Sequence, residues 1–101
     1  MAQLLDDVMV DGSRHFASLP ATADWYSVRD HANALPGAEV TGFVCDGITE
    51  AWIDFTYRGH SFSINDQFGE YWFFAENAEC PEPLLFEVMS HWQALLGPVN
   101  T

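Results

Sequence analysis

The segment EAWIDFTYRGHSFSIN, residues 50–65, decides the fold because it predicts two antiparallel strands joined by a two-residue loop. We place the strands at residues 50–57 and 60–65, on either side of Arg58-Gly59. Glycine takes the positive φ that a primed turn needs, which supports this loop. A slip of one residue would turn every side chain to the opposite face, so the pattern of apolar residues defines the register.

The two faces of this predicted hairpin differ in character. One face brings apolar or aromatic residues together, pairing Tyr57 with His60, Phe55 with Phe62 and Ile53 with Ile64. The other face is mostly polar, pairing Thr56 with Ser61, Asp54 with Ser63 and Trp52 with Asn65. Because alternate residues of a strand point to opposite faces, we expect the first face to lie on a core and the second to stay open.

Two more strands are predicted beside this hairpin. An alternating pattern predicts a strand over residues 39–45, followed by a turn at Asp46-Gly47. The other strand runs from Glu70 to Glu76, after a loop of either residues 67–69 or residues 66–69. The two loops put opposite faces of this strand on the core, so which of its residues point inward stays open.

Two helices are predicted from apolar residues that recur every three or four positions. The first begins near Thr22, a suitable N-cap, and ends at Pro36-Gly37. Its apolar stripe is Trp25, Val28, Ala32 and Leu35. The second begins near Pro81 and Pro83 and ends at Gly97-Pro98. Its apolar stripe is Leu85, Val88, Met89, Trp92 and Leu96.

The N-terminal segment supports two interpretations. Apolar residues at helical spacing across residues 3–18 favour an amphipathic helix, although Gly12 weakens it by about 1 kcal/mol relative to alanine. The alternative is a hairpin that turns at Asp11-Gly12. With the helix, the order of elements is α-α-β-β-β-β-α. The predicted fold class is then α+β, a two-layer single domain over residues 1–101 with helices on one face of a four-stranded antiparallel meander.

The composition describes a strongly acidic folded domain. Fifteen Asp and Glu face three arginines and no lysine, for a formal net charge of −12 in 101 residues. Disorder is not expected, because 49% of the residues are hydrophobic and can fill a core. A field of this sign repels nucleic acid and anionic membranes and attracts basic partners. We therefore predict a protein partner, possible self-association as a homodimer, and no nucleic-acid or membrane partner.

The expected location is the cytoplasm. The longest apolar stretches, residues 71–75 and 84–86, are far shorter than the roughly 20 residues of a membrane span. The first residues carry neither the basic region nor the long apolar region of a signal peptide. Cys45 and Cys80 are accordingly expected to be reduced thiols.

No catalytic, metal-binding or cofactor-binding residue is predicted. The four histidines and two cysteines lack the spacings of zinc sites. Cys80 lies at the start of the last helix, but Glu79 and Glu82 should raise its pKa, so a small apolar filler is the favoured interpretation. A Cys45 or Cys80 enzyme with a histidine remains the least favoured alternative. The acidic loop containing Glu76, Glu79 and Glu82 is expected to be solvated.

The aromatic residues of the fourth strand are the sharpest functional indication. Two of the four residues Tyr71, Trp72, Phe73 and Phe74 must point to the face that carries Trp52 and Asp54. Aromatic side chains grouped with carboxylates on an open face are typical of a protein interface. The alternative is that the N-terminal segment folds over this face and buries them. The predicted partner-binding residues are Trp52, Asp54, Tyr71, Trp72, Phe73 and Phe74.

In size and charge alone, the chain resembles secretion chaperones and toxin immunity proteins. The resemblance involves no particular residues, so it transfers no site. It is compatible with a non-enzymatic module that binds a basic partner. A homodimer closed through the same face, with its function elsewhere, is the main alternative.

Overall fold

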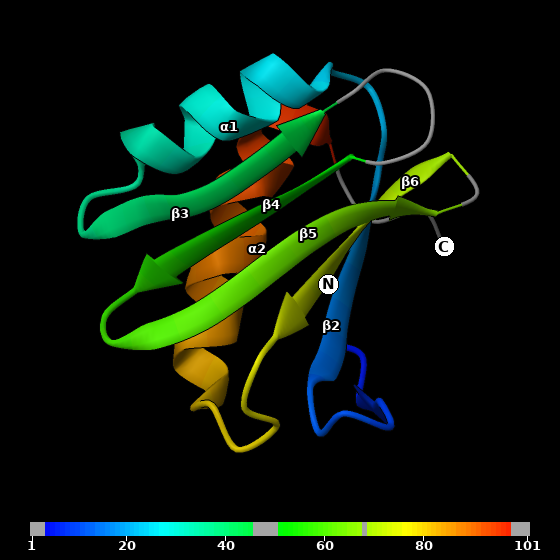
Figure 1. The fold of residues 1–101 in the computed structure, drawn as a ribbon, viewed down its shortest axis with the longest axis vertical. Coiled ribbons are helices and arrows are strands. Elements are labelled where there is room, and N and C mark those ends of the chain that lie inside the picture. Colours follow the sequence, from blue (N-terminus) through cyan, green and yellow to red (C-terminus); the bar gives the residue numbers. More distant parts are fainter. Residues whose placement is uncertain (1–3, 46–50, 68, 98–101) are drawn as a thin grey trace.

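The computed structural model describes residues 4–45, 51–67 and 69–97. Six strands form one antiparallel sheet in the order β1-β2-β6-β5-β4-β3 (Figure 1). The strands are β1 (Asp7–Val8), β2 (Arg14–Pro20), β3 (Ala38–Cys45), β4 (Ala51–Tyr57), β5 (His60–Gln67) and β6 (Glu70–Ala75). The helices are α1 (Trp25–Ala34) and α2 (Glu82–Leu96). The predicted α+β class with an antiparallel sheet is confirmed, but the sheet has six strands rather than four, and the elements follow the order β-β-α-β-β-β-β-α rather than α-α-β-β-β-β-α.

The hairpin of β4 and β5 forms in the predicted register. Tyr57 pairs with His60 across the loop, and Trp52 pairs with Asn65 at the far end. Arg58 and Gly59 have φ angles of 51° and 80°, as a type I′ turn requires at both central positions. The match follows from the alternation of apolar residues, because a slip of one residue would turn the buried aromatic side chains to the other face.

The predicted helix over residues 3–18 is wrong, because this segment forms the hairpin of β1 and β2. Gly12 has a φ of 90° in its loop, and the Asp11 carboxylate accepts hydrogen bonds from the Ser13 amide and hydroxyl. A bulge in β2 follows His15, so two successive residues, Phe16 and Ala17, are both buried in the core. The bulge breaks the alternation that identifies a strand, which is why the pattern favoured a helix.

The loop between β5 and β6 is shorter than either predicted loop. Gln67 pairs with Glu70, and Gly69 has the expected positive φ, at 79°. This register buries Tyr71 and Phe73 on the core face. Trp72 and Phe74 therefore point to the opposite face. The predicted turn at Asp46-Gly47 lies outside the described residues.

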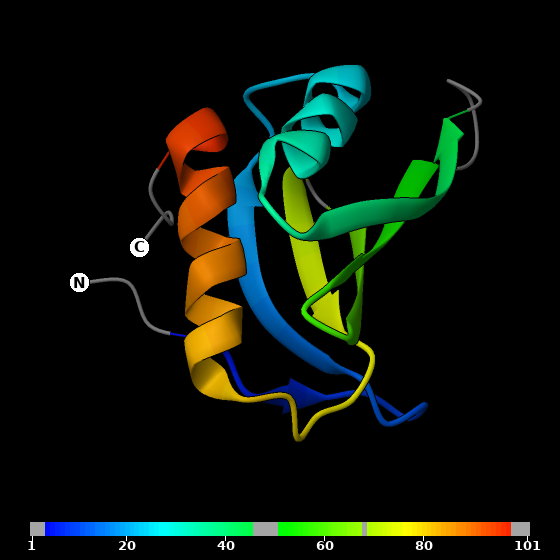
Figure 2. The ribbon, with the colours of Figure 1, turned by 90° about the vertical axis from the view of Figure 1, so that its left-hand side faces the viewer.

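Both helices cover the same face of the sheet, which Figure 2 shows edge-on. The two predicted apolar stripes are buried as expected. Trp92 of α2 is fully buried, with its ring centroid 5.0 Å from that of Phe55 and 5.5 Å from that of Phe73. None of the described helices is long and apolar enough to cross a bilayer.

The start of α1 differs from the prediction. Asp24, not Thr22, is the N-cap, and its carboxylate accepts a hydrogen bond of 2.8 Å from the Ser27 amide. The Thr22 hydroxyl instead donates to the Leu96 carbonyl at the end of α2, at 2.8 Å. The capping pattern alone did not distinguish the two residues, since both are good N-caps.

Candidate functional site

The candidate site is the sheet face opposite the two helices, which we call the open face. Its side chains form two rows across the strands. The first row runs from Trp52 on β4 through Asn65 and Trp72 to Ser18 on β2. The second row runs from Asp54 on β4 through Ser63, Phe74 and His15 to Asp7 on β1. Each row thus mixes aromatic rings with polar groups, and the second ends in a carboxylate on both sides.

His15 is the most enclosed polar group of the open face. Its ring stacks on Trp72 and Phe74, with centroid distances of 4.4 and 5.0 Å, and only 4% of the residue is exposed. Its Nε2 lies 3.0 Å from the Ala17 carbonyl oxygen, so this nitrogen donates and carries the proton. Burial lowers the pKa of His15, which keeps the ring neutral near pH 7.

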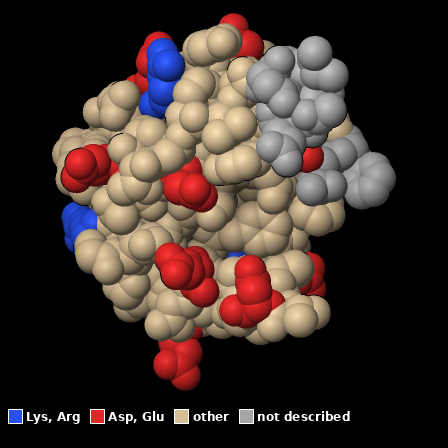
Figure 3. Space-filling view, viewed as in Figure 1, with Lys and Arg blue, Asp and Glu red and all other residues tan. Residues whose placement is uncertain are grey.

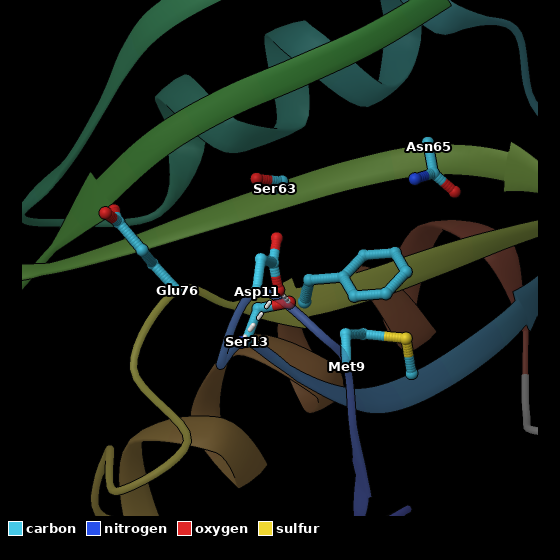
Figure 4. Close-up of a pocket in the computed structure, with 7 residues that line it drawn as sticks. Met9, Asp11, Ser13, Ser63, Asn65 and Glu76 are labelled. Atoms are coloured by element: carbon cyan, nitrogen blue, oxygen red, sulfur yellow. Dashed lines mark hydrogen bonds between the residues drawn. The ribbon is translucent and has the colours of Figure 1, made fainter.

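The β1–β2 loop bounds the open face at its lower end. β2 curves so that this loop projects on the open side of the sheet (Figure 2). Between the loop and the sheet lies a hollow of about 260 Å³. Its lining comes from three regions, with Met9, Asp11 and Ser13 from the loop, Ser63 and Asn65 from β5, and Phe74 and Glu76 from β6 and the residue after it (Figure 4).

The charge of this face is negative. Figure 3 looks onto the open face and shows acidic side chains spread over and around a mostly uncharged surface. The pKa of Asp11 is lowered by the hydrogen bond from the Ser13 hydroxyl, and further by the Ser13 amide. Asp54 lies beside Gly42, where an added Cβ would come within 3.2 Å of its Oδ2. Gly42 therefore leaves room for this carboxylate at the edge of the sheet.

The structure brings four of the six predicted partner-binding residues together on the open face. These are Trp52, Asp54, Trp72 and Phe74, all partly buried. The assignments of Tyr71 and Phe73 are wrong. Both are at most 4% exposed and lie in the core, because the short β5–β6 loop points them toward the helices.

Sequence reasoning missed the residues that the N-terminal hairpin contributes to the open face. His15, Ser18 and Met9 were assigned to a helix, so their approach to β5 and β6 could not be foreseen. The alternative of a hairpin at Asp11-Gly12 was the one signal that could have found them. The alternative in which the N-terminal segment buries this face is confirmed only in part. β2 extends the sheet beside β6 rather than covering the face, and the β1–β2 loop borders one end of the face.

The two cysteines differ in exposure, since Cys45 is half-buried and Cys80 is buried. Cys45 and Cys80 are free thiols, and Cys80 is buried in the core. Burial raises the pKa of Cys80, and Arg14 opposes this shift. The predicted direction is confirmed, but its main cause is burial rather than the flanking glutamates. His60 faces Tyr57 across the hairpin end, as predicted.

The acidic loop before α2 is not a metal site among the described residues, where no group of three or more potential ligands is close enough to hold an ion. Glu76 and Glu79 are exposed. Glu82 lies 3.3 Å from the guanidinium of Arg14, which is buried. The Glu82 carboxylate therefore holds Arg14, and with it the N-terminal segment, against the start of α2.

Comparison with protein-family models, curated proteins and solved structures finds no match to this chain. Functional inference must therefore come from the geometry and chemistry of the open face.

Proposed function

We propose that this protein is a non-enzymatic module that holds a basic protein partner on its open face. The observation that carries this proposal is the double row of side chains on a face opposite both helices. Trp52, Trp72 and Phe74 supply apolar contact area, which is characteristic of interface cores. Asp54 and Asp7 lie at the two ends of the second row, where they would meet positive charges at the rim.

The net charge supports a basic partner. Each arginine already has an acidic neighbour in the chain: Arg14 lies near Glu82, Arg29 near Asp30 and Arg58 near Glu87. Three arginines cannot neutralise fifteen carboxylates, so a strong negative field remains. Such a field accelerates the encounter with a basic protein and is screened by salt. Secretion chaperones and toxin immunity proteins are two classes in which such a module would serve.

Affinity capture followed by titration tests this proposal. Proteins retained at low salt are identified, and the most basic one is purified and titrated against the wild type, Trp52→Ala and Phe86→Ala. Phe86 is a matched control because it is 41% exposed on α2, away from the open face. We expect Trp52→Ala to weaken binding about tenfold or more, as for an interface hot spot, and Phe86→Ala to have little effect. Equal affinity of all three proteins for the partner would contradict the proposal. An association rate that does not change with salt concentration would also contradict it.

The competing occupant of the open face is a second copy of the chain. Two copies that each carry a charge of −12 repel one another, which disfavours this homodimer at low salt. Sedimentation at low and high salt distinguishes the two cases. A monomer under both conditions supports the proposal, whereas a dimer that Trp52→Ala dissociates would replace it.

A further inference from the structure

β3 offers the longest unpaired edge of the sheet in the described part of the chain. The sheet ends in β1 on one side and in β3 on the other, and β1 has two residues against eight in β3 (Figure 1). None of the eight residues of β3 is buried, whereas the neighbouring β4 buries Ile53, Phe55 and Tyr57. Among the described residues, β3 makes a single backbone hydrogen bond outside its pairing with β4, from the Ala38 amide to the Leu35 carbonyl at 3.0 Å. Alternate residues of β3 therefore keep N–H and C=O groups available to another strand.

This edge has few of the features that prevent the addition of a strand. Natural proteins protect edges with lysine, proline, bulges or a covering segment. β3 contains neither lysine nor proline. Its bulge lies between Val40 and Gly42, and residues 42–45 then pair with consecutive residues of β4. α1 packs on the helix side of β3, where the Tyr26 ring centroid lies 5.7 Å from that of Phe43. Residues 42–45 thus form a regular edge.

Gly42 makes the Asp54 carboxylate accessible from this edge. The two residues pair across β3 and β4 and therefore share the open face. A Cβ added at Gly42 would lie 3.2 Å from Asp54 Oδ2 and 3.6 Å from Asp54 Cβ, so the carboxylate leans over the glycine. Gly42 does not have a positive φ, so the backbone conformation does not require glycine here. A glycine inside a strand often marks a place where another backbone approaches closely.

The open-face positions of this edge suit a basic residue and an apolar residue, two places apart. None of the ion pairs in the described part of the chain includes Asp54. The next open-face residue of the edge is Val44, which pairs with Trp52. A strand added beside β3 would place one residue opposite Gly42 and another opposite Val44. The first would face a carboxylate, and the second would face an apolar pair.

We infer that β3 receives an extended segment of a basic protein as a seventh strand of the sheet. The basic side chain opposite Gly42 lies across the glycine, which has no side chain to block it, and forms an ion pair with Asp54. The apolar side chain opposite Val44 extends the row that begins at Trp52. Backbone hydrogen bonds supply affinity, and alternate side chains supply specificity. The inference rests on the proposed function for the basic character of the partner, and adds the way in which the partner reaches the open face.

Hydrogen exchange with a synthetic peptide tests strand addition without any protein partner. The peptide acetyl-Thr-Val-Thr-Lys-Thr-Val-Thr-amide carries lysine and valine two places apart on one face. We expect slower exchange at alternate amides of residues 42–45, because they donate to the peptide, and unchanged exchange at Asp7 and Val8 of β1. Exchange in β3 that stays unchanged at millimolar peptide overturns the inference.

N-methylated peptides show whether the backbone carries the binding. Two forms are compared, each methylated at one of the two sets of alternate amides, and both keep the lysine charge. At least one form should lose binding, because N-methylation removes donors that would face β3. Binding of both forms as tight as that of the parent peptide overturns the inference.

Variants separate the contact with Asp54 from general attraction to an acidic protein. Asp54→Asn should weaken binding of the peptide by about two- to fivefold, the range of partly exposed charge pairs. Asp66→Asn is the matched control, because it removes the same charge from an exposed residue of β5 that pairs with Tyr71, away from the open face. It should leave binding unchanged. An Asp66→Asn effect as large as that of Asp54→Asn overturns the inference.

A second copy of the chain is the competing occupant of this edge. Sedimentation without peptide distinguishes the two cases. A monomer supports the inference, whereas a dimer in which the amides of residues 42–45 exchange slowly overturns it.

The two proposals fail separately. If the peptide protects β3 but no basic protein requires Trp52, strand addition stands and the proposed function fails. If a basic protein requires Trp52 but exchange in β3 is unchanged in its complex, strand addition fails and the proposed function stands.

Discussion

His31 of α1 and His91 of α2 hold the two helices together by a reciprocal contact. The Nε2 of each ring donates to the backbone carbonyl oxygen of the other residue, and both distances are 2.5 Å. The rings stack with their centroids 3.8 Å apart and their planes at 16°. Because both carbonyls accept, each ring carries its proton on Nε2 when it is neutral. A second proton on each ring would place two positive charges face to face.

This contact predicts that stability falls as the solution is acidified. Burial lowers the pKa of His91; the hydrogen bond to the His31 carbonyl opposes this shift, and the charge of a protonated His31 ring adds to it, so the net direction is downward. The unfolded chain then binds more protons than the folded chain below the ordinary histidine pKa of 6.5. The contribution is complete above pH 6.5 and is lost as the pH falls from there toward the folded pKa. Urea unfolding at pH 7.5 and 5.5 measures the change.

His91→Gln is the informative variant for this pH dependence. Glutamine retains an N–H donor but does not titrate, so the loss of stability between the two pH values should be smaller than in the wild type. Glu87 and Arg58 line the same hollow as His91 and remain in place in the variant. His15, whose pKa is also lowered by burial, leaves a residual slope of the same sign. An unchanged slope in His91→Gln would show that the contact does not titrate.

The meander and the last helix were predictable because local patterns determine them. The β4–β5 register follows from paired apolar residues around a two-residue loop, and the stripe of α2 follows from its spacing. The N-terminal hairpin was not predictable in the same way. The bulge after His15 puts Phe16 and Ala17 on one face and removes the period of two. Pairing of β2 with β6 joins distant parts of the chain, which no local pattern encodes.

The part of the candidate site that lies on the β4–β5 hairpin was predictable, because the register of that hairpin was. Trp52 and Asp54 share a face with Asn65 and Ser63, and this follows from the register alone. The choice between the two faces of β6 depended on one residue of loop length, which composition does not determine. The hollow beside Asp11 depends on the curvature of β2, a property of the assembled sheet.

Replacing Trp92 with phenylalanine should lower the free energy of unfolding less than the full burial of Trp92 suggests. It is fully buried, and its Nε1 has no hydrogen-bond partner. Trp92→Phe loses packing but also removes this unpaired donor, a cost of about 1–3 kcal/mol in a buried site. We therefore expect Trp92→Phe to lower the free energy of unfolding by roughly 1 kcal/mol, against about 3–5 kcal/mol for Trp92→Ala. A loss of stability from Trp92→Phe as large as that from Trp92→Ala in urea unfolding would contradict this expectation.

Arg58→Asn should stabilise the β4–β5 hairpin. Arg58 has a φ of 51°, and asparagine occupies this left-handed region more readily than arginine. The variant loses an exposed ion pair with Glu87 and a cation–π contact with Tyr57 at 5.3 Å. These contacts offset part of the gain, so the expected net increase is about 0.5 kcal/mol. Gly59→Ala, which forces a side chain into a φ of 80°, is the opposite control and should destabilise the protein.

Arg14 should anchor the N-terminal segment to the start of α2. Its Nε donates to the Leu5 carbonyl at 2.9 Å, while both terminal nitrogens donate to Glu82 at 3.3 Å. Arg14→Met keeps the apolar stem but removes these donors, with an expected loss of about 1.5–3 kcal/mol. Hydrogen exchange of the Leu5 amide, which donates to the Phe16 carbonyl, should accelerate. If that exchange stays slow, the guanidinium is not what anchors the segment.

The position of β2 between β1 and β6 also affects how the chain folds during its synthesis. β2 leaves the ribosome well before its partner β6 and its covering helix α2. The nascent chain must therefore carry an unpaired strand edge, with Phe16 and Leu19 exposed, until β6 appears. The β3–β6 meander can assemble from neighbouring segments, whereas the edge next to β6 closes last. Slow translation across residues 20–70 would lengthen the exposure of this edge and promote aggregation of the nascent chain.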